Sequence, residues 1–186
     1  MQLKKNLKEN FKNLFNNKMN NNNNNLKQFS INMEAKRYFD DGNSFYDLNR
    51  FEEALDSYEK CIQLNPNYAN AYNNKGICYY SLKNYEKAIE CYDKAILVNS
   101  RDADAFYNRG NALYALAKYN EAIESYEQSI FLDPTDADVY CSKANTLFQL
   151  NKNKEAIKCF DKSIELNPKF SLAIENRKLV LNVTKK

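Results

Sequence analysis

The three glycines and the three prolines of this chain all fall on one 34-residue grid. The glycines are Gly42, Gly76 and Gly110, each 34 residues from the next, and the prolines are Pro66, Pro134 and Pro168, separated by 68 and 34 residues. Glycine and proline have the most unusual backbone requirements, so their common period indicates a structural unit that is repeated along the chain. The 186 residues are therefore expected to form an array of 34-residue repeats.

Counting from Ala35 divides the chain into four repeats, residues 35–68, 69–102, 103–136 and 137–170. The same positions of each repeat carry the same kind of side chain. Position 4 is aromatic (Tyr38, Tyr72, Phe106, Tyr140), position 8 is small (Gly42, Gly76, Gly110, Ala144), position 20 is alanine (Ala54, Ala88, Ala122, Ala156) and position 24 is a large aromatic (Tyr58, Tyr92, Tyr126, Phe160). Small residues let two helices cross closely and a large aromatic fills the space beside them, which predicts a helical hairpin in every repeat.

This pattern resembles that of the tetratricopeptide repeat family, over four times 34, or 136, of the 186 residues. The resemblance implies an all-α fold, an α-solenoid of four helix-turn-helix repeats wound into a right-handed superhelix. Ser100 replaces the proline that ends the second helix elsewhere, and Asn153 replaces an aromatic at the start of the second helix of repeat 4, where we expect a less regular turn. Residues 171–184 begin like another first helix and then stop, which predicts a capping helix at this end of the array.

Residues 1–33 precede the repeats and include an unbroken run of asparagine from Asn20 to Asn25. A segment of this composition cannot bury enough apolar surface to offset its chain entropy, so it is predicted to be disordered. The alternative is an organelle-targeting or membrane-surface helix, because Leu3, Leu7 and Phe11 could share one helical face with lysines elsewhere. The lack of arginine and the presence of Glu9 argue against targeting, and a cytoplasmic location is expected.

The basic charge of the chain lies in this extension. Residues 1–33 carry six of the 27 basic residues and one of the 24 acidic residues, a net charge of 6 − 1 = +5, which leaves 21 basic and 23 acidic residues, a net charge of −2, for the rest. The repeats therefore lack the excess of cations that a nucleic-acid-binding surface requires.

The composition also argues against catalysis. The chain has no histidine, which is the commonest general base and metal ligand. Its five cysteines are not spaced as CxxC pairs, and their odd number argues against a disulfide framework, which favours free thiols in a reducing compartment. No apolar stretch reaches the roughly 18 residues of a transmembrane helix. We therefore expect no enzymatic activity, no metal site, no cofactor and no membrane span.

The resemblance implies that the first helices line a concave groove. Two rows of side chains are expected there: asparagines at positions 6 and 9 (Asn43, Asn74, Asn108, Asn111, Asn145) and aromatics at position 12 (Tyr46, Tyr80, Tyr114, Phe148). An asparagine side chain can pair with a peptide N–H and C=O together, so such rows would bind an extended peptide with little sequence preference. The asparagine row is similar to the repeats of O-linked N-acetylglucosamine transferase, whose catalytic domain is absent here. The alternatives are that the asparagines reflect a compositional bias and that the aromatics pack between adjacent helices.

A third row is basic and lies at position 7 (Lys75, Arg109, Lys143, Arg177). Either it forms a strip for an acidic partner, or its members form ion pairs with nearby carboxylates such as Asp104 and Asp138. Family members that bind heat-shock chaperone tails clamp a carboxylate with three cations. The matching positions from repeat 1 onward hold Phe39, Asp104 and Asn108, so no chaperone tail is expected to bind.

The leading hypothesis for function is a non-catalytic protein–protein interaction module or adaptor that binds an extended peptide segment in its concave groove. A second is a specificity or regulatory subunit of an enzyme complex such as a glycosyltransferase. RNA binding is a third, but the net charge of the repeats argues against it. No nucleic acid or membrane partner is expected, whereas weak self-association through the array ends is compatible with the sequence.

Overall fold

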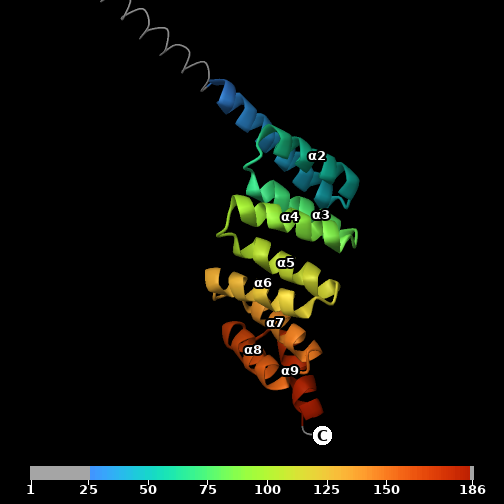
Figure 1. Cartoon of the computed structure of the whole chain (residues 1–186), viewed down its shortest axis with the longest axis vertical. Coiled ribbons are helices and arrows are strands. Elements are labelled where there is room, and N and C mark those ends of the chain that lie inside the picture. Colours follow the sequence, from blue (N-terminus) through green and yellow to red (C-terminus); the bar gives the residue numbers. More distant parts are fainter. Residues whose placement is uncertain (1–25, 185–186) are drawn as a thin grey trace, which may run out of the picture.

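A computed structural model of the chain describes residues 26–184, which form nine helices and no strand. The first helix is described from residue 26 to residue 47. It is followed by α2 (Phe51–Leu64), α3 (Ala69–Ser81), α4 (Tyr85–Val98), α5 (Ala103–Ala115), α6 (Tyr119–Leu132), α7 (Ala137–Gln149), α8 (Asn153–Leu166) and α9 (Ser171–Thr184). The helices succeed one another along the long axis of the molecule (Figure 1).

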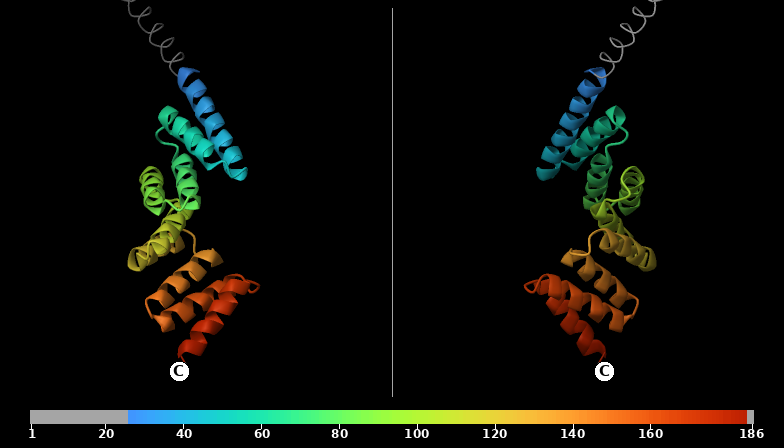
Figure 2. Two further views of the ribbon diagram at one scale, coloured as in Figure 1. Left: turned by 90° about the vertical axis from the view of Figure 1, so that its right-hand side faces the viewer. Right: turned by 90° about the vertical axis from the view of Figure 1, so that its left-hand side faces the viewer.

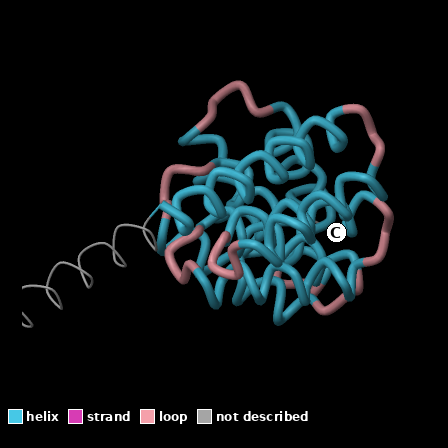
Figure 3. Tube along the Cα trace, turned by 90° about the horizontal axis from the view of Figure 1, so that it is seen from above, coloured by secondary structure: helices cyan, strands magenta, loops and turns pink. Residues whose placement is uncertain are grey.

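Consecutive helices pair as antiparallel hairpins, and each hairpin stacks on the next. Helices α3 and α4, α5 and α6, and α7 and α8 form the hairpins of repeats 2, 3 and 4, and α9 packs on α8. Successive hairpins are rotated relative to one another (Figure 2), and the connecting loops lie at the periphery of the stack (Figure 3). The predicted fold class, a right-handed α-solenoid of four repeats and a cap, is confirmed.

The tightest contact inside a hairpin joins positions 8 and 24. A Cβ atom at Gly42, Gly76 or Gly110 would lie only 2.5–2.6 Å from Cε1 of Tyr58, Tyr92 or Tyr126, respectively. All three rings are 1% exposed, and the alanines at position 20 are completely buried. Each tyrosine ring therefore packs directly against the backbone of the first helix, which explains why glycine recurs at position 8.

Repeat 4 closes its hairpin with a different pair of residues. Ala144 stands at position 8 and Phe160 at position 24, and both are completely buried in one cluster. The two departures from the pattern therefore occur together in one hairpin.

The four hairpin turns share one geometry. The residues at position 15, which are Asn49, Lys83, Ala117 and Asn151, all adopt a left-handed backbone conformation with φ between 58° and 60°. The turn of repeat 4 is as regular as the others, so the expectation of a less regular turn there was wrong. The effect of Asn153 is seen at its side chain, because its Oδ1 is buried without a hydrogen-bond partner among the described residues.

The two ends of the array are formed by the first helix and by α9. Residues 26–33, which were predicted to be disordered, continue the first helix; residues 1–25 lie outside the described part of the chain. Once residues 34–47 are helical, each further residue adds a hydrogen bond without a new nucleation cost. At the other end, α9 buries Ala173 and Val180 against the repeats but leaves Leu179 about half exposed.

Replacing Gly110 by alanine is expected to destabilise the array. The new methyl group would lie 2.5 Å from Cε1 of Tyr126. Overpacking of this kind costs about 1–3 kcal/mol, which exceeds the gain of about 1 kcal/mol from removing a helical glycine. Urea denaturation followed by circular dichroism measures the change.

The same substitution in a Tyr126→Phe background serves as the matched control. The hydroxyl of Tyr126 donates a hydrogen bond to Oδ1 of Asn111 over 2.9 Å, and the phenylalanine ring is free of this tether. The penalty for Gly110→Ala should therefore be smaller in that background. An increase in the stability of the single variant Gly110→Ala would show that the ring shifts without cost.

Candidate functional site

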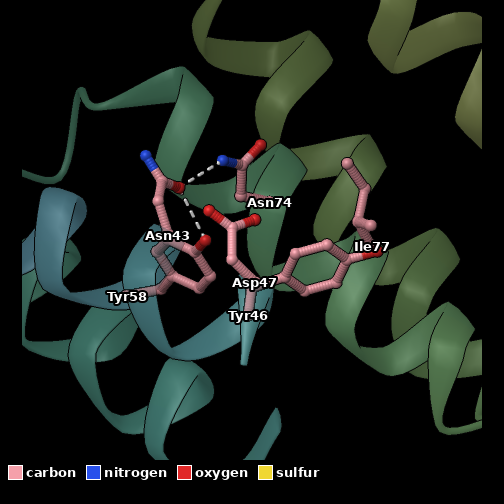
Figure 4. A pocket seen from close by; sticks show the side chains of 6 residues that line it. All are labelled: Asn43, Tyr46, Asp47, Tyr58, Asn74 and Ile77. Carbon is pink, nitrogen blue, oxygen red and sulfur yellow. Dashed lines mark hydrogen bonds between the residues drawn. The ribbon is translucent and has the colours of Figure 1, made fainter. Parts of the chain in front are cut away.

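A cavity of about 340 Å³ opens between the first helices of repeats 1 and 2 (Figure 4). It is lined by Asn43, Tyr46 and Asp47 of the first helix, Tyr58 of α2, and Asn74 and Ile77 of α3. Three of these residues, Asn43, Tyr46 and Asn74, belong to the rows that the sequence assigned to the groove. Ile77 stands at position 9, where it interrupts the row of asparagines, and Asp47 and Tyr58 were not among the predicted site residues.

Asn43 is the centre of the hydrogen bonding in this cavity. Its Oδ1 accepts a hydrogen bond of 2.7 Å from the hydroxyl of Tyr58 and one of 2.8 Å from Nδ2 of Asn74 (Figure 4). Burial raises the pKa of Tyr58 far above the range of an ordinary phenol, so the hydroxyl stays a donor. One amide thus joins the two helices of repeat 1 to each other and to repeat 2.

Other asparagines in the row are also bonded between neighbouring repeats. Nδ2 of Asn176 donates to Oδ1 of Asn145 over 2.9 Å, and Nδ2 of Asn108 donates to Oδ1 of Asn73 over 3.1 Å. Asn73, at position 5, was not among the predicted site residues; it is 9% exposed, and its place one residue before Asn74 gave no separate signal. The amide row is therefore in part an internal network that holds successive repeats in register.

The aromatic row at position 12 packs mainly within its own hairpins. Tyr80 contacts the ring of Tyr85 at a centroid distance of 5.3 Å, and the corresponding pairs in repeats 1 and 3 lie at 5.6 and 5.5 Å. In repeat 4 the partner position is Asn153, so Phe148 has no aromatic partner there. Tyr80 nevertheless remains 37% exposed, so the row offers apolar surface as well as internal packing.

The basic row at position 7 is paired with the second helix of the preceding repeat. The four ion pairs are Lys75–Glu59 at 2.5 Å, Arg109–Asp93 at 2.6 Å, Lys143–Glu127 at 2.7 Å and Arg177–Asp161 at 2.5 Å. The partners are thus carboxylates at position 25, and not Asp104 or Asp138 as the sequence suggested. Each cation is held 16 residues from its partner, across the junction between two repeats.

The carboxyl groups at position 2 of repeats 3 and 4, those of Asp104 and Asp138, have raised pKa values. Burial, followed by the charges of Asp102, Asp136 and Asp133, raises the pKa of Asp104 above its ordinary value. Burial and the neighbouring Asp136 likewise raise the pKa of Asp138. This part of the first-helix face is therefore a region of negative potential.

The cysteines of the described residues are protonated thiols and form no metal cluster. The five cysteines are free, and burial raises the pKa of Cys61 and Cys91 to about 11 and that of Cys78 to about 12, so these thiols stay protonated and unreactive at neutral pH. In residues 26–184, no three histidine, cysteine, aspartate or glutamate side chains are grouped as a metal site. Within the same range, no helix combines the length and the apolar character that a membrane span requires.

Comparison with known protein families finds the tetratricopeptide repeat pattern at residues 69–102 and 137–170 and a second pattern, described as TPR repeat, at residues 42–83 and 110–150. Together these matches span residues 42–102 and 110–170. The first two ranges coincide with the second and fourth 34-residue units counted from Ala35. No curated protein sequence matches this chain.

Several solved structures are similar to the array. MamA has a TM-score of 0.75 and 23% identity, over 80% of this chain and 81% of its own. PilF of Pseudomonas aeruginosa has a TM-score of 0.76 and 22% identity, over 84% of this chain and 71% of its own. The first TPR domain of Spaghetti (RPAP3), solved with the HSP90 peptide SRMEEVD, has a TM-score of 0.63 and 25% identity, over 64% of this chain and 94% of its own.

Asn43→Ala is expected to destabilise the protein by about 1–3 kcal/mol, because the buried hydroxyl of Tyr58 loses its acceptor and Asn74 loses its partner. Asn70→Ala, at an exposed position of α3, is the matched control and should change stability by less than about 0.5 kcal/mol. Chemical denaturation measures both. Equal effects of the two substitutions would mean that the amide network contributes nothing beyond an ordinary surface asparagine.

The ion pair between Glu59 and Lys75 should make stability depend on pH. The hydrogen bond from Lys75 holds the pKa of Glu59 below its ordinary value of 4.5. A carboxyl whose folded-state pKa is lowered stabilises the fold above its unfolded-state pKa, and this contribution is lost as the pH falls through the lower value.

Glu59→Gln is therefore expected to lower the stability by at most about 1 kcal/mol at pH 7, since the carboxylate is partly exposed. The difference from the natural chain should shrink below about pH 4. Thermal denaturation between pH 7 and pH 3 measures it. A difference that stays constant over this range would assign the effect to packing and not to the charge.

Proposed function

Because this chain belongs to the tetratricopeptide repeat family, we propose that it is a non-catalytic adaptor that binds an extended segment of another protein along its first helices. The cavity between repeats 1 and 2 is the observation that carries this proposal, because it combines amide groups with apolar walls at positions 6, 9 and 12. Five free thiols suit a reducing compartment such as the cytoplasm.

The hydrogen-bonding capacity left at this cavity supports a peptide ligand. Oδ1 of Asn43 is used twice within the protein, but among the described residues no hydrogen bond uses its Nδ2. That donor is available to a backbone carbonyl of a bound segment. Tyr46 and Ile77 offer half-buried apolar surface on another wall of the cavity, so that a side chain of the segment can be bound as well as its backbone.

The affinity is expected to be modest. Each hydrogen bond contributes about 0.5–1.5 kcal/mol, whereas association itself costs about 4–15 kcal/mol. Aromatic contacts at Tyr46 and Tyr80 must therefore supply a large part of the binding energy. The sum of the hydrogen bonds and aromatic contacts, less the cost of association, corresponds to dissociation constants in roughly the micromolar range.

A heat-shock chaperone tail is not the segment that we propose. The RPAP3 domain was solved with such an acidic peptide, SRMEEVD. In this chain the positions of the three clamping cations hold Phe39, Asp104 and Asn108, and an additional negative charge at Asp104 would repel a carboxylate.

Capture of partners from a lysate of the native cell by the immobilised full chain tests the proposal. The double variant Ile77→Ser/Tyr80→Ser removes apolar surface on α3 but leaves every asparagine of the network in place. It is expected to reduce capture by roughly tenfold, which corresponds to a loss of about 1.4 kcal/mol from the two side chains together. Circular dichroism verifies that the variant remains helical.

Leu97→Ser/Phe131→Ser is the matched control. These two residues are 78% and 81% exposed on the second helices α4 and α6, so the change removes apolar surface without touching the cavity. It should leave capture unchanged. Loss of the partners in this control, with retention in the α3 variant, would place the interface on the second helices and contradict the proposal.

A further inference from the structure

We propose that the bound segment is basic, and that one of its lysine or arginine side chains enters the cavity between repeats 1 and 2 and ends at the carboxylate of Asp47. This inference rests on the proposed function and specifies the chemistry of the partner.

The cavity has the two parts that a long cationic side chain needs. Tyr46 and Ile77 stand on one side of it, and Asp47 lies among the polar groups near Asn43 and Asn74 (Figure 4). Lysine and arginine side chains likewise combine an apolar stem with a charged tip. The stem would lie against Tyr46 and Ile77, while the tip reaches the carboxylate.

Asp47 carries a charge that the fold itself does not need. It is the last residue of the first helix, where the backbone dipole makes a negative charge unfavourable. The same position in the next three repeats holds a neutral residue, which is Ser81, Ala115 or Gln149. Repeat 1 thus places a carboxylate at the cavity in a location that opposes helix stability.

No cation of the described residues compensates Asp47. Residues 26–184 contain no salt bridge to this carboxylate, and the guanidinium three residues away, that of Arg50, is bound to Glu53 at 2.7 Å. The basic row at position 7 is likewise occupied by its own ion pairs. Asp47 is exposed, so its carboxylate is accessible to a cation of a bound segment.

The negative potential continues along the path that an extended segment would take. Asn74 also lines a second cavity, of about 520 Å³, whose walls include Asp102, Asp104 and Asp133 together with Arg101. The carboxylates outnumber the single guanidinium there, and the pKa of Asp104 is raised by burial first and then by the charges of its acidic neighbours. A basic segment that leaves the first cavity in this direction would relieve that repulsion.

Fluorescence polarisation with the full chain tests this inference. The probes are two labelled peptides of equal length, one alternating lysine with serine and one alternating glutamate with serine. The lysine peptide is expected to bind, and to bind more weakly as salt is added. Asp47→Asn should weaken it by about threefold to fivefold, the effect of losing one partly exposed ion pair.

A control variant and a stability measurement distinguish a binding role of Asp47 from a structural one. Glu90→Gln removes one negative charge from an exposed position on α4 and should leave binding unchanged. Asp47→Asn should leave the thermal midpoint unchanged or raise it, because it removes a charge from the unfavourable end of a helix. Weaker binding with undiminished stability is the combination that supports the inference.

Four results would overturn it. One is tighter binding of the glutamate peptide, and another is an equal effect of Asp47→Asn and Glu90→Gln. A third is no binding of the lysine peptide although capture through Ile77 and Tyr80 persists, which would leave the adaptor proposal standing and remove only the basic partner. The fourth is tighter peptide binding by Lys4→Gln/Lys5→Gln/Lys8→Gln, which would assign the cavity to the chain's own N-terminal residues.

Discussion

The contact between the tyrosine at position 24 and the glycine at position 8 is the constraint on which the rest of the array depends. The ring packs against the helix backbone so closely that no Cβ fits without a shift, and this fixes how near the two helices of a hairpin lie. The geometry of the hairpin in turn determines which side chains of its two helices contact the next repeat. The cavity beside Asn43 therefore takes part of its shape from this packing, since Tyr58 both contacts Gly42 and lines the cavity.

The repeats are joined by two rows of polar contacts in addition to apolar packing. One row is formed by the amides at positions 5, 6 and 9, and the other by the ion pairs between positions 7 and 25. Both connect only adjacent repeats, as expected for an array whose stability is a sum of repeat and neighbour terms. Each ion pair is partly exposed and contributes little energy, but it repeats at every junction and so favours one register of stacking.

The candidate site shows how structural and binding roles share the same side chains. The oxygen of Asn43 is committed to Tyr58 and Asn74, while the nitrogen of the same amide forms no hydrogen bond among the described residues. Asp47 is the opposite case, because it forms no salt bridge in residues 26–184 and stands at the unfavourable end of a helix. Residues that violate a local rule without internal compensation are the ones in which a ligand is expected to supply the missing partner.

The sequence by itself determined the number of repeats, the helical hairpins and the small and aromatic positions of the core, because these follow from a period and from the volumes of side chains. Its composition also showed that the chain has no histidine. The sequence also placed Asn43, Asn74 and Tyr46 on one surface. Only the tertiary structure decided that the amides bond to one another, that the basic row pairs with position 25 and that Asp47 lines a cavity. Those contacts join residues 16 to 35 positions apart, and their distances depend on how one hairpin is rotated on the next, which no local pattern specifies.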